Sequence, residues 1–196
     1  TGKTAAFLLP IIQSIIKKHS ELVTGELAEI QKPVALIIAP TLELAVQIER
    51  NARKFANDTL ARPVVIYGGV AVAYALQMLA RGCAILCGTP GRLKHFISEG
   101  KVSMENIKYV VLDEADRMLD QGFEPEVREI MDAKGMPDKE NRQTLMFSAT
   151  FAAAALTVAA PAFANDQLAR SLGVEPGALT TSQLIQLQSA LSSDEH

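Results

Sequence analysis

Short apolar runs separated by longer amphipathic stretches dominate the first 150 residues of the chain. The runs are rich in β-branched residues and do not alternate with polar ones, which is typical of strands buried on both faces. They lie at residues 34–39, 64–67, 84–87, 109–112 and 144–147. Helical patterns lie at residues 4–18, 42–57, 70–81, 91–98 and 124–133. This alternation predicts an α/β fold in which helices cover a parallel sheet and ligands bind beyond the carboxyl ends of its strands.

The composition changes abruptly after Phe151. Residues 152–164 are mostly alanine and carry no charge, and residues 181–191 have the pattern of one amphipathic helix. Alanine and Pro161 make the uncharged stretch too weakly apolar for a membrane span, so no membrane association is expected. We therefore predict an α/β domain at residues 1–151, followed at residues 152–196 by an alanine-rich linker and a mostly helical or disordered tail of unclear origin.

Charge and cysteine content exclude few classes of function. Residues 1–151 hold 18 basic and 18 acidic residues, so the formal net charge of −3 comes from the tail. A neutral domain binds a polyanion only through a local patch or through backbone N–H groups. Cys83 and Cys87 are too few for a disulfide framework and are expected as small core residues on one strand face. Free thiols fit a reducing, intracellular compartment, either cytoplasm or nucleus.

The chain opens with Thr1-Gly2-Lys3-Thr4, directly before a predicted helix. Gly-Lys-Thr at a helix start is the end of a phosphate-binding P-loop, where helix N–H groups and the helix dipole favour phosphate. Lys3 would then contact the β- and γ-phosphates of ATP, and Thr4 would offer its hydroxyl to Mg²⁺. The tetrapeptide alone is weak evidence for a P-loop, because Gly-Lys-Thr also occurs by chance in many loops.

Asp113-Glu114-Ala115-Asp116 follows the apolar run at residues 109–112. An acidic residue at the carboxyl end of a buried strand lies where a nucleotide-bound metal is held. Asp113 would hold Mg²⁺, partly through water, and Glu114 would orient and deprotonate the attacking water. The alternative is a solvated acidic helix start. The Gly-Lys-Thr about 110 residues upstream makes that alternative the weaker one.

Ser148-Ala149-Thr150 ends the last predicted strand. The two hydroxyls could bond Asp116 and so link the nucleotide state to the rest of the sheet. A capping turn at the strand end is the alternative, because serine and threonine are common there.

Taken in order, these motifs resemble the first RecA-like domain of the DEAD-box RNA helicases. The set also includes Pro40-Thr41-Leu42-Glu43-Leu44-Ala45, Gly68-Gly69 and Thr89-Pro90-Gly91-Arg92, and the flanking segments resemble the Vasa-like subgroup. The resemblance covers residues 1 to about 151. It implies RNA-stimulated ATP hydrolysis with local unwinding of short duplexes, ATP and Mg²⁺ as cofactors, and RNA contacts of low sequence specificity.

The resemblance also implies a role for each motif. Thr1, Gly2, Lys3 and Thr4 bind the nucleotide, and Thr4 also serves the metal. Asp113 and Glu114 serve metal and water, while Asp116, Ser148 and Thr150 couple hydrolysis to strand separation. The RNA backbone would contact three loops, at Pro40, Thr41, Glu43, Gly68, Gly69, Thr89, Gly91 and Arg92. Glycine lets a backbone approach phosphate closely, and Thr89 and Arg92 are natural phosphate donors.

Several departures from the family pattern bear on activity. Leu42 stands where the family has arginine, which removes a phosphate contact. The first half of the P-loop and the strand leading into it do not precede Thr1. The resemblance puts that strand between the strands that end at Asp113 and Ser148. The second RecA-like domain, with its arginine finger, is also absent from the sequence.

These departures leave two readings open. Either the chain is a fragment of an active helicase, or it is a non-catalytic remnant or fused gene-model product that binds phosphate or RNA weakly. On either reading, we expect no helicase-like turnover from the 196 residues alone. A DNA helicase or another P-loop ATPase fits this motif combination less well.

Overall fold

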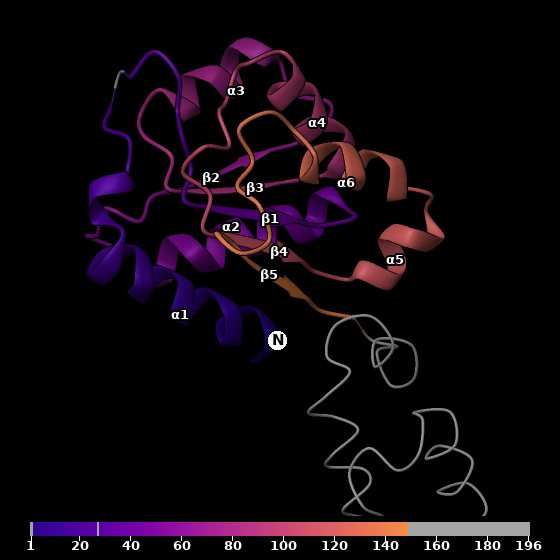
Figure 1. The fold of residues 1–196 in the computed structure, drawn as a ribbon, viewed down its shortest axis with the longest axis horizontal. Coiled ribbons are helices and arrows are strands. Elements are labelled where there is room, and N and C mark those ends of the chain that lie inside the picture. The colour runs from indigo at the N-terminus through magenta and orange to yellow at the C-terminus, as the bar shows by residue number, and fades with distance from the viewer. Residues whose placement is uncertain (1, 27, 149–196) are drawn as a thin grey trace, which may run out of the picture. The chain divides into compact units, whose positions relative to one another are not determined.

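The computed structural model describes residues 2–26 and 28–148, which belong to one compact unit, Thr1–Ala149. The helices are α1 (Gly2–Lys18), the short 3₁₀ helix η1 (Ser20–Leu22), α2 (Leu42–Phe55), α3 (Val72–Leu79), α4 (Pro90–Ser98), α5 (Ala115–Asp120) and α6 (Glu124–Met131). The strands are β1 (Ala35–Ile38), β2 (Pro63–Ile66), β3 (Ile85–Gly88), β4 (Tyr109–Leu112) and β5 (Gln143–Met146) (Figure 1). Every predicted strand and helix of the α/β domain is present and ends within two residues of its predicted bounds. No helix in this part of the chain is long and apolar enough to cross a membrane.

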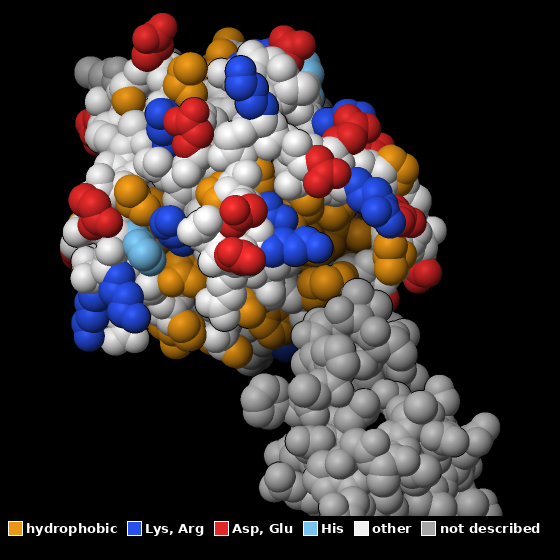
Figure 2. All heavy atoms as spheres, in the orientation of Figure 1, with side chains coloured by type: hydrophobic (Ala, Val, Ile, Leu, Met, Phe, Trp, Pro, Cys, Tyr) orange, Lys and Arg blue, Asp and Glu red, His pale blue; other side chains and the backbone are white. Residues whose placement is uncertain are grey.

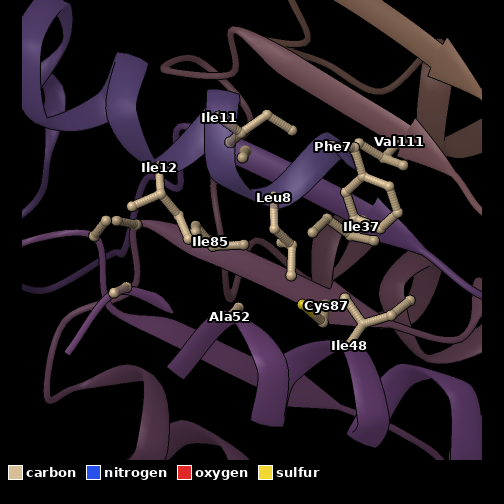
Figure 3. Packing of buried hydrophobic residues seen from close by; sticks show 14 of the residues in the cluster. Phe7, Leu8, Ile11, Ile12, Ile37, Ile48, Ala52, Ile85, Cys87 and Val111 are labelled. Carbon is tan, nitrogen blue, oxygen red and sulfur yellow. The ribbon is translucent and has the colours of Figure 1, made fainter. Parts of the chain in front are cut away.

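The strands form one parallel sheet in the order β2-β3-β1-β4-β5. The sheet lies between two apolar cores, one on each face. One core packs α1 and α2 against one face, with Phe7, Ile11 and Ile48 among its buried side chains (Figure 3). The other core packs α3, α4, α5 and α6 against the opposite face. All strand carboxyl ends therefore meet at one edge, and the predicted parallel α/β fold is confirmed.

The strands before Asp113 and Ser148 are direct neighbours in the described sheet, with no strand between them at the place where the resemblance puts the strand that leads into the P-loop. β4 and β5 pair in parallel, with Leu112 opposite Met146. The pairing continues past the strand ends, because Phe147 N donates to Leu112 O at 2.8 Å and Ala115 N donates to Phe147 O at 2.9 Å. This direct pairing fixes the carboxyl end of β5 against the carboxyl end of β4.

β5 is an edge strand of the described sheet, and its burial differs from the prediction of a strand buried on both faces. Gln143, Thr144 and Met146 are exposed. An apolar hollow of about 170 Å³ lies between α5, α6 and the end of β5, with Leu119 and Met146 among its lining residues (Figure 2). A short apolar run does not distinguish an edge strand from a central one, and this caused the error.

Cys83 and Cys87 are both buried, as predicted, but they lie on opposite faces of the sheet instead of one. The strict alternation of a strand is broken at the start of β3, where Ala84 N and Ile85 N both donate to Arg62 O. Cys83 and Ala84 therefore precede the regular pairing of β3, which begins at Ile85. Burial raises the pKa of both thiols, so neither is a reactive nucleophile.

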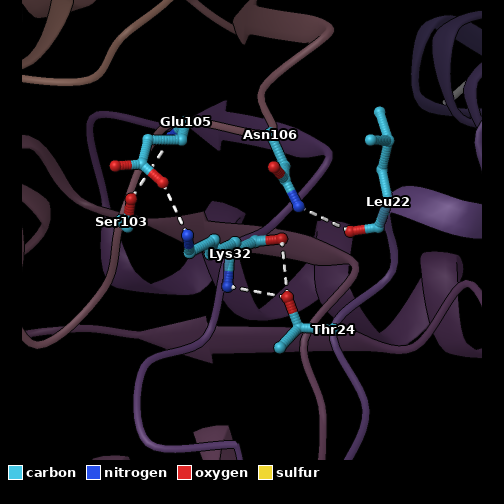
Figure 4. Close-up of polar contacts among 6 residues, drawn as sticks. All are labelled: Leu22, Thr24, Lys32, Ser103, Glu105 and Asn106. Atoms are coloured by element: carbon cyan, nitrogen blue, oxygen red, sulfur yellow. Dashed lines mark hydrogen bonds and ion pairs between the residues drawn. The ribbon is translucent and has the colours of Figure 1, made fainter.

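Polar contacts fix the connection between α1 and β1 at the amino end of the sheet (Figure 4). Asn106 Nδ2 donates to Leu22 O at 2.7 Å, and Lys32 Nζ pairs with Glu105 Oε2 at 2.6 Å. Lys32 N also donates to Thr24 Oγ1 at 3.1 Å. These contacts tie the chain after α1 to the loop that leads into β4, and so hold α1 in place relative to the strand that ends at Asp113.

Candidate functional site

The residues predicted to bind and hydrolyse a nucleotide gather at the carboxyl edge of β4 and β5. One cavity of about 330 Å³ brings together side chains from the start of α1, the end of β4, α5 and the end of β5. Its lining residues are Lys3, Asp113, Glu114, Asp116, Arg117, Asp120 and Ser148. Residues more than 100 positions apart in the sequence thus share one polar site.

Lys3 connects the P-loop segment to the other two motifs. Its Nζ lies 3.5 Å from Ser148 O, and its charge offsets a small part of the rise in pKa that burial causes at Asp113. Gly2 begins α1 in open space, with no atom within 4 Å of where a Cβ would stand. Thr4 is buried and is not among the cavity's lining residues. Thr1 and Thr150 lie outside the described residues, so their predicted roles stay predictions.

Asp113 and Glu114 differ in environment although they are adjacent. The Asp113 side chain is buried at the end of β4, accepts a hydrogen bond from Glu114 N at 3.0 Å, and has its pKa raised, chiefly by that burial. Glu114 has left-handed backbone angles (φ +53°, ψ +49°), which cost a non-glycine residue about 1–2 kcal/mol. Its carboxylate projects into the cavity and pairs with Arg117 Nη1 at 3.1 Å.

The oxygen ligands of the cavity fit a magnesium ion that takes most of its other ligands from a bound nucleotide and from water. The described residues hold no group of three or more His, Cys, Asp or Glu side chains that could ligate a metal without further help. Mg²⁺ in phosphate-transfer sites uses one or two carboxylates and completes its octahedron with phosphate oxygens and water. Asp113, partly desolvated beside Lys3, supplies that kind of carboxylate.

Replacing Asp113 with asparagine should raise the thermal stability of the domain at neutral pH. Burial raises the folded-state pKa, so ionised Asp113 destabilises the fold at every pH above that value. The penalty shrinks as the pH falls through the folded pKa and vanishes below the unfolded one. Melting curves of wild type and Asp113→Asn should therefore differ most at neutral pH and converge in acid. A less stable variant at neutral pH would mean that attraction to Lys3 outweighs desolvation.

The predicted RNA-contacting residues lie in three neighbouring loops at the same edge. Pro40, Thr41 and Glu43 follow β1, Gly68 and Gly69 follow β2, and Thr89, Gly91 and Arg92 follow β3. Because the sheet order is β2-β3-β1, the three loops are adjacent. Thr41 caps α2 by accepting from Leu44 N at 3.3 Å, whereas Thr89 precedes α4 without a side-chain cap. Gly68, Gly69 and Gly91 are exposed, with open space around each.

Arg92 and Arg117 have partners that the sequence did not predict. Arg92 Nη2 donates to Val70 O at 2.6 Å, and its guanidinium lies over the ring of Phe96. Arg117 pairs with Glu114, as a side chain three positions along a helix can. The three-residue spacing between Glu114 and Arg117 could therefore have predicted this pair from the sequence. No local pattern pointed to Val70, which is 22 residues before Arg92.

The covered parallel sheet, with a lysine and paired carboxylates converging at its carboxyl edge, is the arrangement of a RecA-like α/β domain. A model of the DEAD/DEAH box helicase family matches residues 1–158, and the chain belongs to that family. The predicted family is therefore confirmed.

Curated relatives agree with this assignment. The chain is 46% identical over 188 residues to the probable ATP-dependent RNA helicase DDX4 of Sus scrofa and to that of Homo sapiens, covering 96% of this chain and 26% of each relative. It is 50% identical over 151 residues to the ATP-dependent RNA helicase DDX4 of Mus musculus, covering 77% of this chain and 21% of that protein. The chain thus spans about a quarter of the length of the curated relatives it matches. The 188-residue alignments extend beyond residue 151, and a separate origin of residues 152–196 stays a prediction.

Solved structures show the same architecture. The DEAD-box splicing factor Prp28 of yeast matches with a TM-score of 0.67 at 35% identity, over 76% of this chain and 34% of that one. Prp28 from Chaetomium thermophilum, bound to ADP, matches with a TM-score of 0.63 at 41% identity, over 76% and 33%. A DEAD box protein from Methanococcus jannaschii matches with a TM-score of 0.62 at 35% identity, over 76% and 37%.

Proposed function

We propose that this domain binds ATP with Mg²⁺ and the backbone of RNA, and that within a longer helicase it supports RNA-stimulated ATP hydrolysis and local duplex unwinding. The observation that carries the proposal is the single cavity shared by Lys3, Asp113, Glu114 and Ser148. Relatives at 46% and 50% identity are named ATP-dependent RNA helicases, and the Chaetomium thermophilum Prp28 structure contains ADP.

Each group in the cavity has a separate task in this proposal. Lys3, with the N-terminal N–H groups of α1, binds the β- and γ-phosphates. Asp113 holds Mg²⁺, which neutralises charge on the transferred phosphate when it is bound. Glu114 orients the attacking water and takes its proton. Asp116, Ser148 and Thr150 transmit the nucleotide state to the sheet. A second helicase domain would supply the arginine that stabilises transition-state charge.

RNA is the proposed partner, bound through sugar and phosphate along the β1, β2 and β3 loops. Exposed glycines leave room for a polymer backbone, and backbone N–H groups contact phosphate without reading bases. Low sequence specificity follows from such contacts. Because ATP and RNA are intracellular substrates, an intracellular location is part of the proposal.

The test is ATP hydrolysis with and without single-stranded RNA, measured on a protein that joins this domain to the upstream P-loop residues and a second helicase domain. We expect turnover that rises on addition of RNA. The 196-residue chain and a version ending at Phe151 serve as comparisons, and neither should reach that rate. RNA-stimulated turnover by the 196-residue chain that disappears in the shorter version would contradict the expectation of no helicase-like turnover and would show that residues 152–196 contribute to activity. Absence of RNA stimulation in the longer protein would contradict the proposed function.

Leu42→Arg should strengthen RNA binding and make it more dependent on salt. Leu42 is exposed at the first position of α2, beside the proposed RNA loops. One added contact to a single-stranded phosphate should steepen the slope of log affinity against log salt by about 0.7. Fluorescence anisotropy of a labelled RNA over a salt series measures this slope. Leu60→Arg is the matched control, because Leu60 is similarly exposed but lies near the amino end of β2. An unchanged slope for Leu42→Arg would show that this position does not face RNA.

A further inference from the structure

Arg92 connects two loops of the proposed RNA interface. It lies in the first turn of α4, after β3, and its Nη2 donates to the carbonyl of Val70, in the loop after β2, at 2.6 Å. The guanidinium carbon lies 5.0 Å from the centre of the Phe96 ring, and Phe96 is fully buried in the core. A rigid aromatic surface on one helix thus orients the side chain that reaches the neighbouring loop.

The loop that Arg92 reaches has little else to hold it. Within residues 2–26 and 28–148, the contact with Arg92 is the one hydrogen bond that residues 68–70 make. No atom lies within 4 Å of where a Cβ would stand on Gly68 or Gly69, and Gly69 has a left-handed φ of +86°. Glycine is conformationally the most permissive residue, so two in succession make a loop whose shape depends on outside contacts.

Two nitrogens of the guanidinium are turned toward the protein. Nη2 is directed to Val70 O, and Nε is enclosed by protein without a hydrogen-bond partner among the described residues. The ring of Phe96 covers one face of the group. These contacts orient Arg92 along the protein surface toward the loop.

We propose that Arg92 is a positioning residue of the RNA interface, which holds the Gly68–Gly69 turn at a fixed spacing from the start of α4. The inference rests on the proposed RNA binding and deepens it. The phosphates would then meet N–H groups of two loops that are already ordered, so that binding does not bear the cost of ordering them. Ordering one residue costs about 1–2 kcal/mol, which corresponds to roughly tenfold in affinity.

The experiment compares Arg92→Gln with wild type in the 196-residue chain, using a fluorescently labelled oligo-uridine over a series of low salt concentrations. We expect roughly tenfold weaker binding at every salt concentration and an unchanged slope of log affinity against log salt. Gly69→Ala should behave similarly without any change of charge, because alanine is strained at a φ of +86°. Arg81→Gln controls for net charge, because Arg81 is exposed at the opposite end of the sheet.

A second readout needs no RNA. Amide hydrogen exchange at residues 68–71 should be faster in Arg92→Gln, while exchange in the β1 and β4 strands stays as in wild type. A salt slope that falls by about 0.7, as expected for loss of one direct phosphate contact, would overturn the proposal. So would unchanged loop exchange, or faster exchange with unchanged affinity. If wild type itself binds no RNA, the proposed function fails, whereas the exchange data still report on the contact between Arg92 and the loop.

Discussion

Glu114→Gln should slow ATP hydrolysis by about 10²–10⁴-fold, the contribution typical of a general base, while ATP and RNA still bind. Glutamine keeps the size and shape of the side chain but cannot accept the proton of the attacking water. The left-handed backbone at Glu114 is also retained, because the substitution changes only the side-chain terminus. The measurement is single-turnover hydrolysis, together with ATP affinity, in the longer protein that carries both helicase domains.

Asp120→Asn is the matched control for Glu114→Gln. Asp120 lines the same cavity and undergoes the same carboxylate-to-amide change, but it lies at the far end of α5. Its rate should stay within a few-fold of wild type. Loss of ATP binding in Glu114→Gln, with hydrolysis reduced only in proportion, would assign Glu114 to binding and remove it as the base.

The fold followed from the sequence because its strongest signals are local. β-branched runs at residues 34–39 and 109–112 are too apolar to face water, and the stretches between them have helical periodicity. Parallel strands then bring their carboxyl ends to one edge, which places Asp113 and Ser148 at the same edge of the sheet. The short helix α5 was not predicted, because six residues give too short a periodic pattern.

What the sequence could not provide was pairing between distant segments. The direct contact of β4 with β5 depends on strand order, which no apolar run encodes. The opposite faces of Cys83 and Cys87 arise because Cys83 precedes the regular part of β3, whose start is set by pairing with β2. The contact between Arg92 and Val70 likewise joins two loops through the tertiary structure.

Lys3→Ala should remove most ATP binding and lower the rate of hydrolysis by at least about 10²-fold, the loss typical of removing one donor to transition-state charge. Lys3 is the one basic side chain at the start of α1, and it lies against Ser148 O and near Asp113. Without it, the phosphates would meet the carboxylates of Asp113 and Glu114 with less positive charge to offset the repulsion. Titration with a fluorescent ATP analogue, alongside hydrolysis in the longer protein, measures both losses. Lys17→Ala, in the last turn of the same helix, should change neither.

Lys3→Ala should also lower the stability of the domain. Comparing it with and without Asp113→Asn separates the loss of charge attraction from the loss of local packing. Burial raises the pKa of Asp113 and the charge of Lys3 partly offsets that rise, so removing Lys3 should leave the buried carboxylate less compensated and the domain less stable at neutral pH. In the Asp113→Asn background there is no carboxylate to compensate, so Lys3→Ala should then cost little. Melting temperatures of the two single variants and the double variant give the coupling directly. Equal costs in both backgrounds would show that Lys3 and Asp113 do not interact.

Wild-type ATP affinity in Lys3→Ala would exclude Lys3 from the phosphate site.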